Sequence, residues 1–172
     1  MFPELATSVL ESPIDDIHEL KKQYSNLIIQ IDRLRPALAH VSPVARAGDS
    51  KWTITEIFGH LIDTDRDIWW PRIDQLLVDD RPCFVDIDPD TLIGKHNWDA
   101  LPVEDVLAQL LRIRWNNSMR LNSLPRAAFD RTGIHSLHGE ITLTQILAIL
   151  VAHDTHYLGL VRSLVEAPLE TE

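Results

Sequence analysis

Histidine is the side chain of this sequence with the widest chemical use, because eight histidines stand beside a single cysteine, Cys83. Imidazole binds zinc, nickel, copper and iron, and it exchanges protons near neutral pH. A single cysteine excludes an intramolecular disulfide framework and a cysteine-based zinc ribbon. Any transition-metal site in this chain must therefore be built on imidazole. The histidines are His18, His40, His60, His96, His135, His138, His153 and His156.

Three of these histidines lie where a helix would turn them towards a protein core. His153 continues an apolar seam with the spacing 146, 150, 153, 157, 160 and 164, and His60 lies between Ile57 and Thr64 on another stripe. His156 is three residues after His153 and projects from nearly the same side. Ligands from different helices converge on a metal in this way, and three neutral imidazoles leave an open position for water or substrate. The alternative is a buried histidine that only hydrogen-bonds to a neighbour, and the HExxH signature is absent.

Carboxylates near these histidines are candidate partners, because a carboxylate beside a metal-bound imidazole fixes its tautomer. Asp63, three residues after a proposed ligand, is the preferred partner. We expect Asp65 to lie on a solvated helix face and to pair with a neighbouring arginine. Asp154 directly follows another proposed ligand and so points to a different side. A surface position or pairing between helices is therefore expected for it.

Four segments with helical period must position these residues, and no segment alternates convincingly over the length of a strand. They span about residues 13–40, 53–77, 102–124 and 142–166. The second begins at Thr53, where Glu56 completes a capping box, and Pro71 predicts a kink or step inside it. The fourth begins at Thr142 or Thr144.

Two long connections separate the later helices. Residues 79–101 are too many for a plain connector, so we expect them to be functional or packed over something, with Phe84 and Trp98 as anchors. All five tryptophans, Trp115 included, are expected to anchor the core or an interface.

The second connection, residues 125–141, is a polar loop that holds His135 and His138 and is expected to fold over one end of the helices. Four helices with long connections predict an all-α fold, a four-helix bundle in which crossovers are permitted. At 172 residues the chain has the length of one domain, so we expect residues 1–172 to form a single bundle domain.

Composition narrows the classes of partner. The formal net charge of −10 opposes binding to phosphate backbones and to anionic membrane surfaces, so neither nucleic acid nor membrane is expected as a partner. The longest apolar run, residues 146–152, is far too short to span a bilayer, and no signal peptide is visible. We therefore expect a cytoplasmic protein.

Three segments resemble the DinB/YfiT-like superfamily. Residues 51–63, KWTITEIFGHLID, are similar to the signature of its second helix, in which a tryptophan and a capping serine or threonine precede a histidine–leucine pair. Residues 139–143 and 152–159 resemble its last loop and last helix. The resemblance covers about residues 12–165.

The resemblance implies a four-helix bundle with crossover connections, often dimeric, that holds a divalent metal, typically nickel or zinc. His60 matches the first family ligand and His153 the second. The third family ligand usually stands four residues after the second, which here is Tyr157, whereas His156 occupies the preceding position. The implied metal site is therefore His60, His153 and His156, with Tyr157 as the alternative third ligand.

Two functions of different class follow. The first is a metal-dependent enzyme that acts on a small molecule, because characterised members include S-transferases and isomerases that use low-molecular-weight thiols, and others are known only as metal-dependent hydrolases. The metal would lower the pKa of a thiol or a water molecule, and both long loops would shape the pocket. The alternative is a non-catalytic, stress-related binding or dimerisation module with a degenerate metal site, which Tyr157 at the third position favours. For either function, the partner that the resemblance implies is a second copy of the chain, in a homodimer.

Overall fold

The computed structural model describes residues 2–11, 16–42, 45–46, 52–87, 89–92 and 95–166. Its helices are α1 (Phe2–Glu11), α2 (Ile17–Arg33), α3 (Arg35–Leu38), α4 (Ile54–Thr64), the π-helical turn η1 (Asp65–Trp69), α5 (Trp70–Val78), α6 (Val103–Ser123) and α7 (Leu143–Val165). Three 3-10 turns are η2 (Pro89–Leu92), η3 (Trp98–Ala100) and η4 (Arg126–Asp130). The strands are β1 (Cys83–Phe84), β2 (Thr132–His135) and β3 (Gly139–Thr142).

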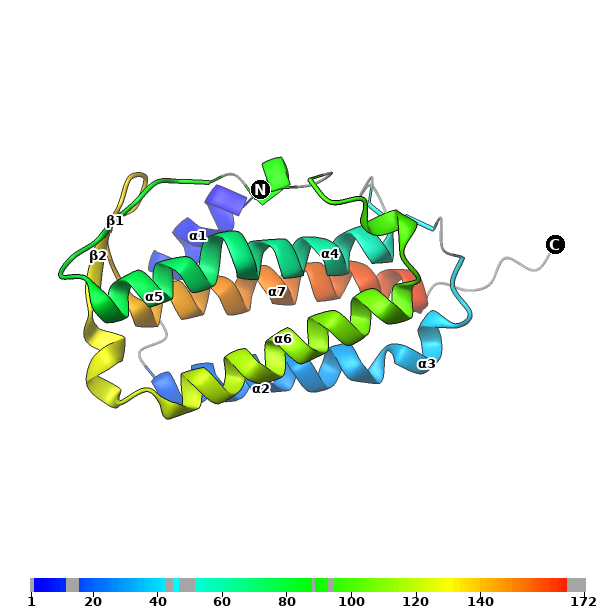
Figure 1. The fold of residues 1–172 in the computed structure, drawn as a ribbon, viewed down its shortest axis with the longest axis horizontal. Helices are drawn as coiled ribbons and strands as arrows, with labels where there is room; N and C mark the ends of the chain where they lie inside the picture. Colours follow the sequence, from blue (N-terminus) through cyan, green and yellow to red (C-terminus); the bar gives the residue numbers. More distant parts are fainter. Residues whose placement is uncertain are drawn as a thin grey trace.

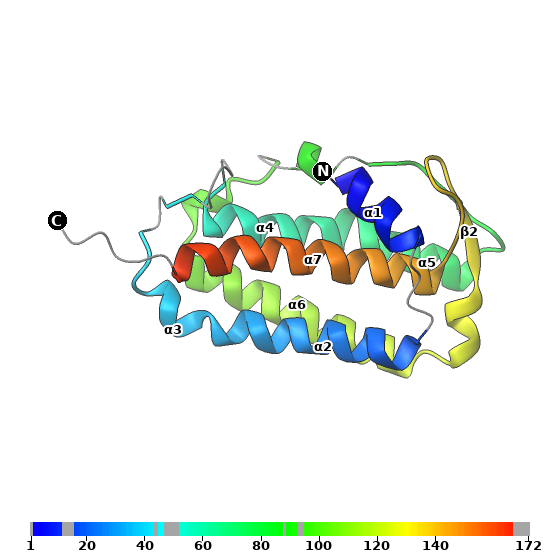
Figure 2. The same ribbon diagram turned by 180° about the vertical axis from the view of Figure 1, so that it is seen from behind.

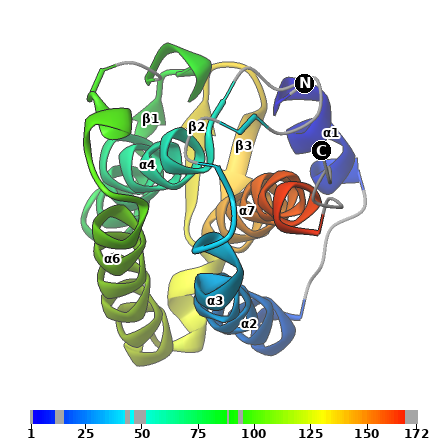
Figure 3. The same ribbon diagram turned by 90° about the vertical axis from the view of Figure 1, so that its right-hand side faces the viewer.

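Four helical rods form the bundle, namely α2, α4 with its continuation α5, α6 and α7 (Figures 1 and 3). Both α2 and α4 pack against α6 and α7, so α2 and α4 lie on one diagonal and α6 and α7 on the other. The connections from α2 to α4 and from α6 to α7 therefore cross the bundle, whereas α4 and α6 are neighbours, so the predicted crossovers are present. The helix α1 packs against the outer side of α7 (Figure 2).

Rods α4 and α6 run in the same direction, which explains the long connection between them (Figure 1). After α5 the chain must return along the bundle before α6 begins, and the described residues 79–87, 89–92 and 95–102 lie along that return. Phe84 and Trp98 are buried along this path, so their predicted role as anchors is confirmed. Within the described residues, no helix has the length and apolar character needed to cross a bilayer.

The predicted start of the second rod is confirmed, and so is the step near Pro71. The Thr53 hydroxyl accepts from the backbone N–H of Glu56, and the Glu56 carboxylate accepts from the backbone N–H of Thr53. The step is the π-helical turn η1, which ends just before Pro71 enters the first turn of α5. Because proline has no backbone N–H, Pro71 cannot donate the hydrogen bond of a regular helical turn. Such π-helical turns are frequent at functional sites.

The predicted start of the first helix, at about residue 13, lies outside the described residues; α2 begins at Ile17, with Asp16 as N-cap. Two features differ from the sequence prediction: the helix α1 precedes the first predicted segment, and strands form where none were expected. A small sheet of order β1-β2-β3 closes one end of the bundle, and its strands are too short to show a period. Trp115 is 51% exposed, because it follows the buried Arg114 and lies on the outer face of α6, so it does not anchor the core and its role at an interface stays a prediction.

Candidate functional site

Two histidines from different rods face each other in the core. The Nε2 atoms of His60 in α4 and His153 in α7 lie 3.3 Å apart, and the side chains are 3% and 0% exposed. Burial and the neighbouring His153 lower the pKa of His60 to about 3, and burial also lowers the pKa of His153. Both imidazoles are therefore neutral near pH 7, the form that a metal ligand needs.

An aromatic frame surrounds this pair. The ring of Tyr157 lies with its centroid 4.6 Å from that of His60 and 4.8 Å from that of His153. Tyr157 in turn stacks on Trp52 at 5.4 Å, with the rings nearly parallel at 3°. The structure therefore brings together His60, His153 and the residue at the family's usual third-ligand position.

His156 is placed differently. It is half-buried on α7, and its ring meets the edge or face of the Tyr157 ring at 5.2 Å and 78°. Across the described part of the chain, no three His, Cys, Asp or Glu side chains are grouped so that they could hold a metal ion. The proposed metal ligands, His60 and His153 with His156 or Tyr157 as the third, therefore stay a prediction.

A buried carboxylate orients His153, and it is Asp154. Its Oδ1 lies 3.1 Å from Nδ1 of His153, and its Oδ2 lies 2.6 Å from Nη1 of Arg114 in α6. The Nε of Arg114 lies 3.1 Å from Oδ2 of Asp65 in η1. Arg114, Asp65 and Asp154 are each 1% exposed. The pairing between helices expected of Asp154 is thus confirmed.

The expectation that Asp65 is solvated is wrong. All but one of the residues of α4 are buried, because the returning chain covers the side that an amphipathic helix would leave to solvent, and burial continues into η1. Burial raises the pKa of Asp65 to about 7, although Arg114 opposes the rise. Helical period alone did not identify Arg114 as part of the site; its only signal is a basic residue at an otherwise apolar, core-facing position of the third predicted helix.

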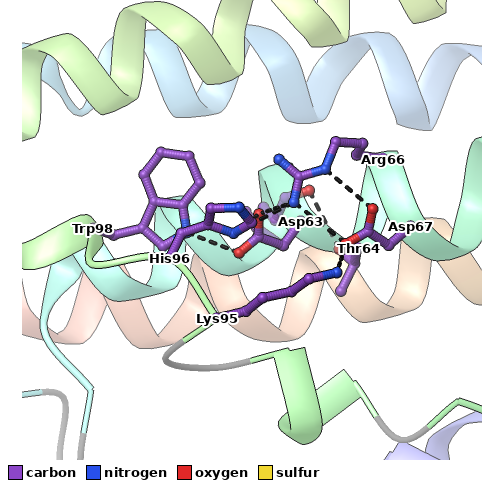
Figure 4. Close-up of polar contacts among 8 residues, drawn as sticks. Asp63, Thr64, Arg66, Asp67, Lys95, His96 and Trp98 are labelled. Atoms are coloured by element: carbon purple, nitrogen blue, oxygen red, sulfur yellow. Dashed lines mark hydrogen bonds and ion pairs between the residues drawn. The ribbon is translucent and has the colours of Figure 1, made fainter.

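Asp63, the expected carboxylate partner of His60, has other partners in the structure. Oδ2 of Asp63 accepts from Nε1 of Trp98 at 2.8 Å, and Oδ1 lies 2.7 Å from Nη2 of Arg66 and 3.2 Å from Nδ1 of His96 (Figure 4). Asp63 therefore ties the returning chain to α4. The contact that fixes a ring of the histidine pair is made by Asp154.

A pocket opens beside His60. Its volume is about 180 Å³, and the returning chain and α4 form its walls. The lining residues are Glu56, His60, Asp63, His96, Asn97, Trp98 and Asp99. The Nδ1 atom of His60 is buried without a hydrogen-bond partner.

The second pair of histidines lies elsewhere. His135 on β2 is buried and stacks on His138 at 4.8 Å, at the end of the bundle, and burial, together with Arg72, lowers the pKa of His135 to about 4. The expected fold of this segment over the bundle end is confirmed (Figure 1). Neither histidine lines the pocket beside His60, contrary to the expectation that this loop shapes it.

The facing nitrogens fit a transition metal. Two zinc–nitrogen bonds of roughly 2.0–2.1 Å at a tetrahedral angle place their nitrogens about 3.3–3.4 Å apart. The Nε2 atoms of His60 and His153 already have this separation at 3.3 Å. The same distance also suits a hydrogen bond between two neutral imidazoles, so the geometry serves both states.

Comparison with known proteins places this arrangement in a family. Two proteins of Oceanobacillus iheyensis are similar to the chain: "Putative metal-dependent hydrolase OB0413" is 23% identical over 146 residues, which are 85% of this chain and 83% of that protein. "Putative metal-dependent hydrolase OB0782" is 22% identical over 163 residues, 94% of this chain and 88% of that protein.

The fold has a solved counterpart. YfiT from Bacillus subtilis, described as a probable metal-dependent hydrolase with an unusual four-helix bundle topology, matches with a TM-score of 0.74 and 20% identity over 88% of this chain and 90% of that one. The sequence model of the DinB superfamily matches residues 19–161, which include both rods of the histidine pair. The chain therefore belongs to the DinB superfamily.

Proposed function

We propose that this chain is a metal-dependent enzyme of hydrolase type, in which His60 and His153 hold a divalent transition metal ion. The observation that carries the proposal is the pair of Nε2 atoms 3.3 Å apart in the core, with one ring fixed by Asp154. Hydrolase-type chemistry is favoured because the relatives from Oceanobacillus iheyensis carry that name.

The bound metal would supply the positive charge that lowers the pKa of a nucleophile at neutral pH. The residues of the chain do the rest. Neutral imidazoles donate their lone pairs, and the pocket beside His60, about 180 Å³, admits a small molecule. Zinc and nickel both suit imidazole ligands.

A thiol-dependent S-transfer reaction would use the same site. Cys83 lies exposed on β1, in the sheet at the end of the bundle. A low-molecular-weight thiol would therefore enter with the substrate rather than come from the chain. To separate the two reactions, turnover of esters and amides is measured with and without an added thiol. Turnover without the thiol indicates hydrolysis, whereas turnover that requires the thiol indicates S-transfer.

Metal binding is the first test. Calorimetry with Zn²⁺ and Ni²⁺ should show a single ion bound by the metal-free wild-type protein and lost binding in His60→Ala and His153→Ala. His18→Ala is the control, since His18 is exposed on α2 and should leave binding unchanged. No binding by the wild-type protein, or equal binding by His153→Ala, would sink the proposal.

Two further variants identify the third ligand. Tyr157→Phe removes only the hydroxyl and keeps the ring that stacks on Trp52, whereas His156→Ala removes an imidazole whose contact is the Tyr157 ring. If His156 is the ligand, only His156→Ala lowers the affinity; if Tyr157 is the ligand, Tyr157→Phe lowers it.

A non-catalytic binding module is the second candidate. It is favoured by the finding that no three His, Cys, Asp or Glu side chains of the described ranges are grouped to hold a metal. If the chain is such a module, the wild-type protein should be folded and should bind neither Zn²⁺ nor Ni²⁺. It also expects His60→Ala to leave any cellular phenotype intact.

A further inference from the structure

We propose that Arg114 is a positioning residue for the histidine pair: acting through Asp154, it holds His153 in the tautomer that presents the Nε2 lone pair to His60. Arg114 lies one side chain back from the two facing nitrogens, on α6, and reaches His153 through Asp154. The inference rests on the proposed function only for its metal-binding readout, since the tautomer is a property of the metal-free protein.

The chain of contacts runs in one direction from Arg114 to the pair. Nη1 of Arg114 donates to Oδ2 of Asp154 at 2.6 Å, and Oδ1 of Asp154 lies 3.1 Å from Nδ1 of His153. A carboxylate only accepts, so Nδ1 of His153 carries the proton. Its Nε2 is then a bare acceptor, facing Nε2 of His60 at 3.3 Å.

Arginine suits this position because its planar guanidinium presents several donors at fixed angles. Nε faces Asp65 at 3.1 Å while Nη1 faces Asp154 at 2.6 Å, so the two carboxylates hold the group from two sides. Arg114 only donates hydrogen bonds, so the atom of residue 154 that faces it must be an acceptor. The orientation of Asp154, and through it that of His153, follows from Arg114.

A purely structural role is the competing explanation, because this cluster joins all four rods. Nη1 of Arg114 also donates to the hydroxyl of Tyr24 in α2 at 3.4 Å, and Nδ2 of Asn117 in α6 donates to Asp65 at 3.2 Å. Loss of any member should lower stability, so stability cannot separate the two explanations. The tautomer of His153 can.

The two buried aspartates form a matched pair of variants. Each is 1% exposed and contacts Arg114, but only Asp154 contacts His153. In Asp154→Asn, Arg114 still requires an acceptor, so the amide must turn its oxygen to Arg114 and its NH₂ to His153. An NH₂ group facing Nδ1 moves the proton of His153 to Nε2. Asp65→Asn leaves Asp154 in place and should keep the wild-type tautomer.

Nitrogen-15 NMR of the imidazole rings in the metal-free protein measures this directly. We expect the His153 proton on Nδ1 in the wild-type protein and in Asp65→Asn, and on Nε2 in Asp154→Asn. In Arg114→Met with Asp154→Asn, nothing orients the amide and the reversal should disappear. The double variant removes both charges of one ion pair, so it avoids the unpaired carboxylate that Arg114→Met alone would leave beside His153.

A proton that stays on Nδ1 in Asp154→Asn overturns the proposal, and so does an equal reversal in Asp65→Asn. Zn²⁺ affinity is the second readout: Asp154→Asn should lose roughly 10–100-fold, as other supporting residues of metal-bound histidines do, and Asp65→Asn much less. If the wild-type protein binds no metal while the tautomers change as expected, the proposed function fails and the role of Arg114 stands. If metal binds and the tautomers do not change, the proposed function stands and the role of Arg114 is refuted.

Discussion

Substitution of Gly59 by alanine should detach the returning chain from α4. An added Cβ at Gly59 would lie 2.1 Å from Cγ, 2.2 Å from Cδ1 and 2.5 Å from Cδ2 of Trp98. Ordinary contacts begin at 3.4 Å, and the clash is with the base of the indole ring rather than with a flexible end. The ring must therefore move by more than 1 Å.

The expected cost follows from three contributions. Displacing the ring costs about 1–3 kcal/mol as overpacking. Losing the Trp98–Asp63 hydrogen bond, 2.8 Å long and made to a carboxylate, costs about 1.5–3 kcal/mol more. Alanine returns about 1 kcal/mol through its higher helix propensity. Together they lower the free energy of unfolding by about 1.5–5 kcal/mol.

Urea unfolding followed by circular dichroism measures this change against a matched control. Gly159→Ala in α7 is the control, because an added Cβ there meets nothing within 4 Å and should stabilise the protein by about 1 kcal/mol. In Gly59→Ala with Trp98→Ala the clash is gone, so the two substitutions should not be additive. The reasoning is refuted if Gly59→Ala and Gly159→Ala change stability equally.

Two further predictions concern pH and the small sheet. Burial lowers the pKa of His60 to about 3 and of His135 to about 4, so unfolding takes up protons below pH 6.5, and stability should fall as pH falls from about 6.5 to 4. Asp65, with its pKa raised to about 7, works against this trend as one group against three, because burial also lowers the pKa of His153; urea titrations of metal-free protein across this range should not give a flat profile. In Gly133→Ala the added Cβ would lie 2.5 Å from Cε2 of Phe84, so we expect a loss of about 1–3 kcal/mol with unchanged metal affinity, measured by urea unfolding and calorimetry.

Much of the histidine pair could be predicted from periodicity alone. A helix places residues three and four apart on one side, so His60 and His153 on apolar stripes had to face the core of any bundle built from these segments. The Thr53–Glu56 capping box was predictable for the same reason, since its partners are three residues apart. Local spacing contains this information.

The partners of the pair could not be predicted in this way. Asp154 and Asp65 are assigned to their roles by Arg114, which lies 40 and 49 residues from them along the chain. Two of the partners of Asp63, His96 and Trp98, come from a segment more than 30 residues later. No period connects such residues, because their contact depends on which rods become neighbours.

The sequence by itself determined the helical rods, their apolar faces and the presence of two histidines in the core, because these depend on spacing within a single helix. Only the tertiary structure decided that α4 is covered on nearly all sides and that Asp65 is buried. It also decided that Asp154, rather than Asp63, orients the pair. The physical reason is that burial and charge pairing depend on what the other rods and the returning chain place around a residue.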